Sequence, residues 1–281
     1  MLGQQVLRTF TDGPGLAGAK VIATSRNPKQ PNFVKFSFPE TSLEELVEGC
    51  DVGDGDYVLN CAGWIPQRNN ASNPLDRAAA TQINSILPML LSEISQDRDI
   101  RVISIGTDCV FSGRDEGPYS ETSPQNPIDF YGATKALGEM YPSEQMVIRT
   151  SIIGESTRTS SGLFEWFRSQ PMDAVIEGYT NHFWNGTSTH FFSRVLKGVV
   201  EFDSYSPGVQ HLVPADSCSK AELLQLFQNK LGRNDVQILQ REAPSSVRRV
   251  LTTSNPERNR DLWNLAGFQE IPTISEAVDS I

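Results

Sequence analysis

Hydrophobic and polar residues alternate between strand-like and helix-like patterns over the first half of the chain. Short apolar runs typical of strands occupy residues 20–25, 33–38, 57–62 and 101–105. The last two runs are apolar on both faces, as in a parallel sheet that is covered on two sides.

Helical patterns separate these runs. One begins at Ser42, where Glu45 completes a capping box, and another spans residues 75–96 with apolar positions three and four apart. This strand–helix alternation predicts a doubly wound α/β fold with a parallel sheet.

The pattern changes at about the middle of the chain. A helix is predicted over residues 131–141 and a strand over 146–153, so the sheet should contain at least five strands. Beyond Gly154, serine, threonine, glycine and aromatic residues become common, and predicted helices at 190–201 and 219–231 are joined by polar loops. We therefore expect two parts: a dinucleotide-binding domain over 1–154 and a mainly substrate-binding part over 155–281, with room in the latter for one late strand of the sheet.

Composition fits an ordinary folded protein. Of the 281 residues, 38% are hydrophobic and 21% charged. Because no apolar run is long enough for a membrane helix and the N-terminus lacks a secretory-signal pattern, we expect a cytoplasmic chain with no membrane partner. The four cysteines form no CxxC pair and the three histidines show no ligand spacing, so neither disulfides nor a metal are expected.

Charge narrows the range of partners. A net charge of −10 repels polyphosphate backbones, which disfavours nucleic acid. A small anionic substrate remains compatible, since a few arginines in a cleft can bind one diphosphate.

The sharpest chemical signal is Tyr131 followed four residues later by Lys135, in a predicted helix. Positions four apart share a helix face, so the phenol and the ammonium can reach one ligand. A positive neighbour favours the ionised phenol, and lowering its pKa from about 10 to about 7 corresponds to about 4 kcal/mol. Such a tyrosine can exchange a proton near neutral pH.

A hydroxyl upstream strengthens this signal, because a bare YxxxK occurs by chance in many chains. Thr107 directly follows the strand-like stretch that ends at Gly106. Ligands of open α/β sheets bind at the carboxyl ends of strands. A hydroxyl there could donate to a carbonyl oxygen on which negative charge develops.

Three longer stretches carry a resemblance to a known family. SIGTDCVFSG (104–113), GPYSETSPQNPIDFYGATKALGE (117–139) and VIRTSIIG (147–154) resemble the extended short-chain dehydrogenase/reductases, and within them the dTDP-4-dehydrorhamnose reductase-like sugar-nucleotide reductases. The likeness continues more weakly through 181–196, 211–227 and 245–253. One departure is Gly106, where many relatives carry serine; we expect its effect to be slight.

The resemblance implies a Rossmann-like fold and an NADP-dependent reduction of a 4-keto nucleotide-linked sugar in polysaccharide or glycan synthesis. Tyr131 would supply the proton to the sugar oxygen, Lys135 would hold the nicotinamide ribose, and Thr107 would orient the carbonyl. Two alternatives stay open: an epimerase or dehydratase of the same family, and a sugar-nucleotide-binding protein with impaired catalysis. A homodimer also stays open.

The expected glycine-rich turn is only partly represented. The opening Met1-Leu2-Gly3-Gln4 is similar to the tail of the family's GxxGxxG motif, with Gly3 as its last glycine, and the strand before it has no counterpart. We therefore expect unpaired inner strand edges, and either weak dinucleotide binding or a longer working protein. The segment 12–18 (DGPGLAG) is interpreted as a glycine-rich turn into the next strand.

The family pattern implies further cofactor contacts. Ser25 and Arg26 end the strand where an arginine accommodates the 2′-phosphate of NADP; a merely solvated arginine is the alternative. Cys61, Ala62 and Gly63 match the segment that lies against the cofactor. Asn84 matches a commonly retained asparagine, with a plain surface amide as the alternative.

Substrate contacts are expected from both halves. Asp108 would contact sugar hydroxyls, while Arg248 and Arg249 would bind the diphosphate unless they are a basic surface pair. Phe183 and Trp184 are expected to pack the second part rather than stack on a base.

Overall fold

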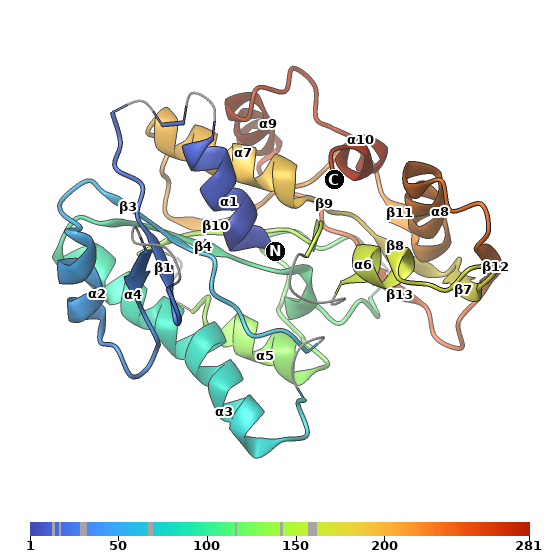
Figure 1. Ribbon diagram of the computed structural model, residues 1–281, viewed down its shortest axis with the longest axis horizontal. Helices are drawn as coiled ribbons and strands as arrows, with labels where there is room; N and C mark the ends of the chain where they lie inside the picture. The colour runs from blue at the N-terminus through green and yellow to red at the C-terminus, as the bar shows by residue number, and fades with distance from the viewer. Residues whose placement is uncertain are drawn as a thin grey trace.

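A parallel four-stranded sheet forms the centre of the computed structural model, which describes residues 1–12, 15–16, 18–28, 33–66, 70–115, 117–140, 143–156 and 162–281. Its strand order is β10-β5-β4-β3, and helices lie on both faces (Figure 1). The strands are β1 (Ala23–Ser25), β2 (Phe33–Lys35), β3 (Tyr57–Asn60), β4 (Arg101–Ile105), β5 (Met146–Arg149), β6 (Ile152–Ile153), β7 (Val175–Tyr179), β8 (His182–Trp184), β9 (Thr187–Ser188), β10 (Gly208–His211), β11 (Cys218–Ser219), β12 (Gln237–Arg241) and β13 (Val247–Arg249). The α-helices are α1 (Leu2–Thr11), α2 (Leu43–Cys50), α3 (Pro74–Thr81), α4 (Leu87–Asp97), α5 (Phe130–Leu137), α6 (Leu163–Arg168), α7 (Thr189–Glu201), α8 (Lys220–Leu231), α9 (Pro256–Leu265) and α10 (Ile274–Asp279), with a π-helical segment η2 (Gln82–Ile86) and a 3-10 turn η3 (Asp108–Val110).

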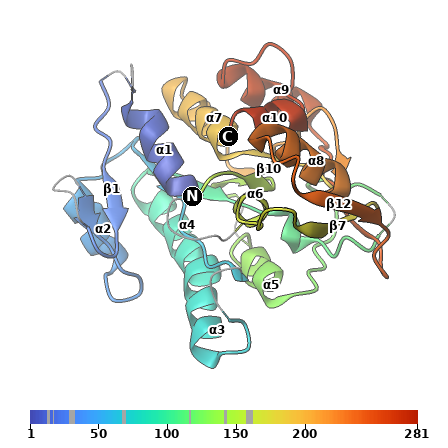
Figure 2. The same ribbon diagram turned by 45° about the vertical axis from the view of Figure 1, so that its right-hand side comes forward.

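Side-chain alternation on β4 explains the layers. Ile103 points into one cluster with residues of α1, α7 and α9, whereas its neighbour Val102 points into another with residues of α2 and α4. Both side chains are fully buried. The strand is therefore covered on two sides, as its continuous apolar run predicts, and Figure 2 shows α1 and α7 on one side and α4 on the other. The predicted α/β fold is confirmed.

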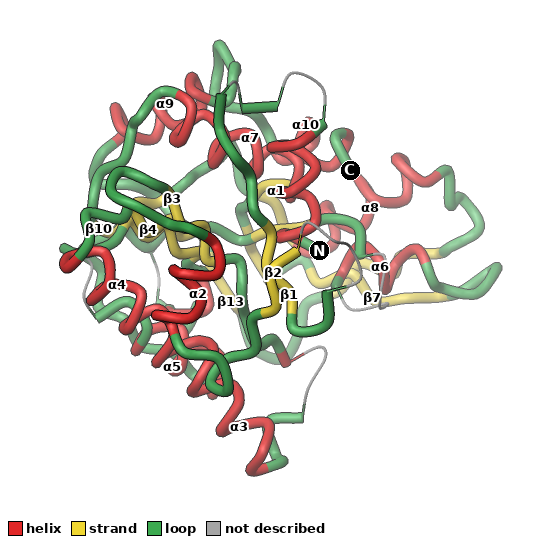
Figure 3. The backbone as a smooth tube through the Cα atoms, turned by 60° about the vertical axis from the view of Figure 1, so that its left-hand side comes forward, coloured by secondary structure: helices red, strands yellow, loops and turns green. Residues whose placement is uncertain are grey.

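The sheet is divided. β1 pairs in parallel with β2 from Ala23↔Phe33 to Ser25↔Lys35, and within the described residues no strand joins this pair to β3. The prediction of one sheet with at least five strands is therefore wrong for the part of the chain described. Instead, β2 packs on α2, where a Cβ built on Gly49 would lie 3.5 Å from Val34 (Figure 3).

Most predicted elements occur, with shifted ends. Ser42 caps α2 through the predicted capping box with Glu45. The predicted helix at 75–96 is broken by η2 into α3 and α4, and the predicted strand at 146–153 divides into β5 and β6. In the segment 12–18, Gly15 and Gly18 have positive φ as a turn requires, while residues 13–14 and 17 lie outside the described residues.

The C-terminal half both completes the sheet and builds a second cluster. β10 pairs with β5 along its whole length, and α7 and α9 cover the central sheet. The second cluster gathers around Phe164, Phe167 and Phe227, which α6 and α8 bring together. Among the helices described, none combines the length and apolar character needed to span a bilayer.

Glu121 ties the loop before α5 to the C-terminal half. Its carboxylate accepts from the backbone N–H of His211 (2.9 Å), the Thr253 hydroxyl (2.7 Å) and the backbone N–H of Ser254 (2.8 Å). Partial burial alone would raise its pKa, but these hydrogen bonds outweigh burial and hold the pKa of Glu121 at about 2.

We expect Glu121→Gln to lower the free energy of unfolding by about 1–2 kcal/mol at pH 7, after allowance for solvent screening. Because the pKa is lowered in the folded state, this stabilisation is full above the ordinary glutamate pKa and is lost as pH falls toward about 2. Urea unfolding of both proteins at a series of pH values should show the difference shrinking below about pH 4. Substitution of the exposed Glu270 by Gln is the control; a difference that is constant with pH would contradict the assignment.

Candidate functional site

The site begins where α5 packs against the segment that follows β4. Asp129 caps α5 by accepting from the Gly132 N–H at 2.7 Å, which fixes the start of the helix. A Cβ at Gly132 would collide with the Cys109 carbonyl oxygen. Glycine at this position therefore lets the first turn of α5 lie directly on the Thr107 segment and brings Tyr131 to it.

Thr107 and Tyr131 meet at this contact. Thr107 is buried and caps η3, with its Oγ1 accepting from the Cys109 N–H at 3.3 Å and donating to Asp108 Oδ1 at 3.2 Å. It also lies close enough to the Tyr131 phenol to lower the pKa of that group. The hydroxyl and the phenol that the sequence predicts as partners thus lie together at the carboxyl end of β4.

The electrostatics of Tyr131 differ from the expectation. Burial raises the pKa of Tyr131, nearby Cys109 and Asp108 act in the same direction, and the neighbouring Thr107 hydroxyl opposes them. The predicted lowering is therefore not what this structure shows. The physical reason is that the Lys135 ammonium is directed to a backbone carbonyl rather than to the phenol.

Lys135 lies one helical turn beyond Tyr131 and reaches the same strand end. Its Nζ donates to the Ile105 carbonyl at 2.7 Å. Burial lowers the pKa of Lys135, and the Glu139 carboxylate acts in the opposite direction. Thr107, Tyr131 and Lys135 therefore converge around the last residues of β4.

A buried ion pair lies beneath them. Arg149 on β5 and Glu139 are joined at 2.7 Å, with side chains 3% and 4% exposed. A Cβ at Gly106 would lie 3.0 Å from the Glu139 carboxylate and closer still to the Arg149 side chain. This pair explains the departure from the family's serine, since a larger residue at 106 would displace it.

The segment after β3 presents small residues to solvent. Ala62 and Gly63 are exposed, and Cys61 is half-buried, with burial raising its pKa to about 12. Gly3 on α1 lies at the same place, because a Cβ built on it would be 3.4 Å from the Cys61 Cβ. The structure thus brings together four of the predicted cofactor residues.

Asn84 is neither a surface amide nor a group open to a ligand, so both interpretations from the sequence need correction. It is 1% exposed and belongs to η2. Its Oδ1 accepts from the Trp64 N–H at 2.9 Å, and its Nδ2 donates to the Trp64 carbonyl and to the Thr134 hydroxyl, both at 3.1 Å. Because its amide is committed to the loop after β3 and to α5, Asn84 positions both.

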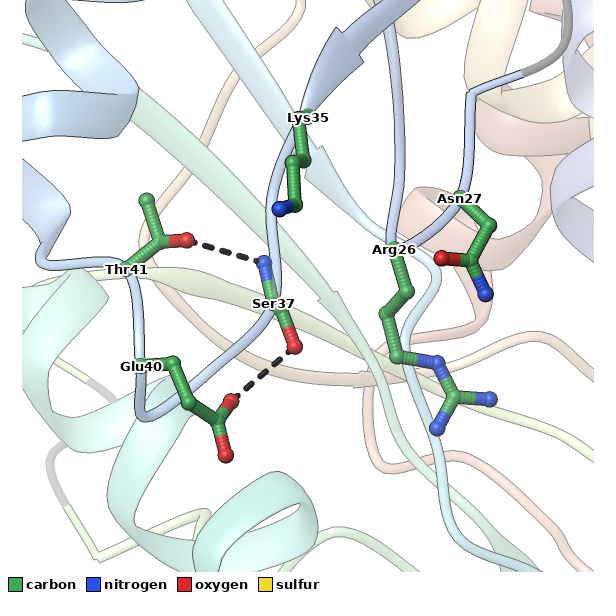
Figure 4. A pocket seen from close by; sticks show the side chains of 6 residues that line it. All are labelled: Arg26, Asn27, Lys35, Ser37, Glu40 and Thr41. Atoms are coloured by element: carbon green, nitrogen blue, oxygen red, sulfur yellow. Dashed lines mark hydrogen bonds between the residues drawn. The ribbon is translucent and has the colours of Figure 1, made fainter.

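A polar pocket of about 590 Å³ lies at the carboxyl ends of β1 and β2, apart from the Tyr131 segment. Figure 4 shows Arg26 and Lys35 on opposite sides of it, while Ser37 is fixed by Thr41 (3.2 Å) and Glu40 (2.9 Å). Ser25 ends β1 next to Arg26. Two cations around an open polar space fit a phosphate group, and Lys35 is the one that the sequence analysis missed.

The two predicted diphosphate arginines lie apart. Arg249 is half-buried: its Nε donates to the Phe111 carbonyl at 3.1 Å, and Nη1 lies 3.7 Å from Cys109 Sγ. Arg248 is exposed and its guanidinium lies over the Phe183 ring at 5.2 Å. Neighbouring residues of a strand point to opposite faces, so only Arg249 reaches the Thr107 segment, and the prediction of a joint site is wrong.

Asp108 is the buried partner of that arginine. Burial raises the pKa of Asp108, whereas Arg249 and hydrogen bonds from Thr107 and Cys109 lower it. Lys220, at the start of α8, acts in the same direction as Arg249. Nothing in the sequence around Lys220 marked it. Trp184 packs against the second cluster, as predicted.

Known proteins resemble this chain over much of its length. The probable low-salt glycan biosynthesis reductase of Haloferax volcanii is 34% identical over 141 residues, which are 50% of this chain and 44% of that protein. A dTDP-4-dehydrorhamnose reductase from Clostridium acetobutylicum has a similar structure, with a TM-score of 0.70 at 17% identity over 100% of this chain and 94% of that one. A second dTDP-4-dehydrorhamnose reductase, from Bacillus anthracis and solved in complex with NADP, has a TM-score of 0.66 at 19% identity. The match covers 84% of this chain and 82% of that one.

The matching regions span about half the length of the first curated relatives. Because the solved structures are only 17% and 19% identical to this chain, they support its fold and nothing more specific. The RmlD substrate binding domain model matches residues 2–261, which is nearly the whole chain, and the chain therefore belongs to that family.

Proposed function

We propose that this protein reduces a 4-keto nucleotide-linked sugar with NADPH, for the synthesis of a surface polysaccharide or glycan. The observation that carries the proposal is the convergence at the end of β4 of the Thr107 hydroxyl, the Tyr131 phenol, whose pKa Thr107 influences, and Lys135, which donates to the Ile105 carbonyl at 2.7 Å. The names of related proteins, a glycan biosynthesis reductase and dTDP-4-dehydrorhamnose reductases, agree with it.

The protein's own groups suit the proton half of a reduction. When bound, NADPH supplies the hydride that reaches the keto carbon of the sugar. Thr107 donates to the ketone oxygen, and Tyr131 gives that oxygen its proton, which leaves an alcohol. Burial raises the pKa of the Tyr131 phenol, which therefore holds its proton at neutral pH and gives it up only to a strongly basic oxygen such as the alkoxide that hydride transfer creates. Lys135 holds α5 to the end of β4 through its hydrogen bond to the Ile105 carbonyl.

The polar pocket at β1 and β2 supports NADPH as the cofactor. Arg26 and Lys35 present two positive charges beside an open space that would take the 2′-phosphate. The related Bacillus anthracis structure contains NADP. We also propose a cytoplasmic location, which is supported by four cysteines present as free thiols.

We expect Tyr131→Phe to reduce the rate of NADPH oxidation with dTDP-4-dehydrorhamnose by about 100-fold or more, because the proton donor is removed. NADPH affinity should stay within about twofold, since the ring and its packing are kept. The matched control is Tyr179→Phe, at a half-buried tyrosine on β7 whose hydroxyl donates to Glu177. Product analysis should show net NADPH consumption, whereas turnover without consumption would indicate an epimerase, and an unchanged rate in Tyr131→Phe would refute the catalytic assignment.

We expect Arg26→Gln to weaken NADPH binding about tenfold or more while NADH binding is unchanged, since a charge-assisted phosphate contact contributes about 1.5–3 kcal/mol. Lys35→Gln should also weaken the binding of NADPH and not of NADH, but by a smaller factor. Calorimetric titration of each variant with both cofactors measures this, with the exposed Arg98→Gln as control. An equal loss for NADPH and NADH would contradict a 2′-phosphate site.

A further inference from the structure

Lys220 is a half-buried cation for which the described residues supply no ion-pair partner. It is the first residue of α8, directly after the cap formed by Ser219 and Glu222. Within the part of the chain that the structure describes, its ammonium makes no hydrogen bond or ion pair. A desolvated ammonium with no acceptor is costly, so such a group calls for an explanation.

The charge of Lys220 does not stabilise the start of α8. The first turn of a helix carries a partial positive charge, so a cation there is repelled rather than stabilised. Glu222 already satisfies the helix start, with its carboxylate accepting from the Ser219 N–H at 2.7 Å. The charge of Lys220 therefore opposes the stability of α8.

Strand pairing places the start of α8 close to Arg249. In the sheet β11-β8-β13, Trp184 pairs with Cys218 on one side and with Arg249 on the other, so these three residues form one row with side chains on one face. Figure 1 shows the three strands beside α8. Lys220 begins α8 directly after β11, at the end of this row, and Arg249 lies 3.7 Å from the Cys109 thiol through its Nη1.

The carboxylates near this pair are already engaged. Asp108 Oδ1 accepts from the Thr107 hydroxyl, and the Asp129 side chain caps α5 and lies 3.9 Å from Arg249. The charges of Asp108, Cys109 and Arg249 all act on Lys220, whose pKa is lowered by burial. Lys220 thus lies beside the Thr107 segment with its ammonium still free to bind an anion.

We propose that Lys220 and Arg249 together hold the diphosphate of the substrate, an inference that rests on the proposed function. A guanidinium can bind one phosphate through two parallel hydrogen bonds, and an ammonium serves as a point charge for the other. The two ends of the substrate would be held by different elements. Thr107 after β4 and Tyr131 on α5 face the ketone, whereas the two cations come from β13 and α8. In a pyranose, the keto carbon and the carbon that bears the diphosphate lie at opposite ends of the ring.

The test is Lys220→Met, which keeps the aliphatic stem and removes the charge. We expect dTDP and inorganic pyrophosphate to bind about tenfold more weakly, with little change for thymidine or NADPH, because a charge-assisted contact contributes about 1.5–3 kcal/mol. KM for the sugar nucleotide should rise while kcat stays nearly unchanged, because the contact is made equally with the bound substrate and with the transition state. Thermal stability should be equal or higher. Lys230→Met is the control on the same helix, since this exposed lysine donates to the Asp279 carbonyl at the other end.

Equal dTDP affinity in wild type and Lys220→Met would overturn the inference, as would an equal loss for thymidine and dTDP. The proposed function fails in a different way. If the wild-type protein oxidises no NADPH with a 4-keto sugar nucleotide while dTDP binding still depends on Lys220, only the reaction is refuted, and the diphosphate site stands.

Discussion

The site depends on how closely α5 approaches the rest of the domain. Two glycines on this helix make the approach possible: Gly132 lies against the Cys109 carbonyl and Gly138 against the Asn84 carbonyl, and a Cβ at either would collide with backbone. Such contacts leave no space for adjustment in a close-packed interior. The nearness of Tyr131 to Thr107 and the reach of Lys135 to the Ile105 carbonyl both depend on this close approach.

The π-helical segment η2 connects that contact to the neighbouring strand. A π-helix inserts a residue into the helical ladder and redirects a side chain, and it often marks functional places. Here it directs Asn84 inward, where its amide bonds Trp64 and Thr134. The loop that carries Ala62 and Gly63 is thereby held in a fixed relation to Tyr131, so the predicted cofactor and proton-transfer segments form one unit.

Sequence patterns predicted the features that local chemistry determines. Apolar runs located β3 and β4, a capping box located α2, and the YxxxK spacing with a strand-end hydroxyl located the converging groups. The separation of β1 and β2 from β3 agrees with the unpaired inner strand edges expected from the sequence, whereas the expected count of at least five strands in one sheet was wrong for the described residues. Lys35 and Lys220 were missed since single lysines carry no periodic signal, and Arg248 and Arg249 were grouped although strand alternation separates them.

The pairing of β10 with β5 has a consequence for how a ligand can enter. This strand comes from the C-terminal half but is hydrogen-bonded along its whole length to the sheet that carries Thr107. Through β10 the C-terminal half thus adds an edge strand to the frame that carries Thr107, and this frame stays intact unless a ladder breaks. Any movement that admits a ligand therefore has to lie outside the ladder, in loops or in the second cluster around Phe164 and Phe227.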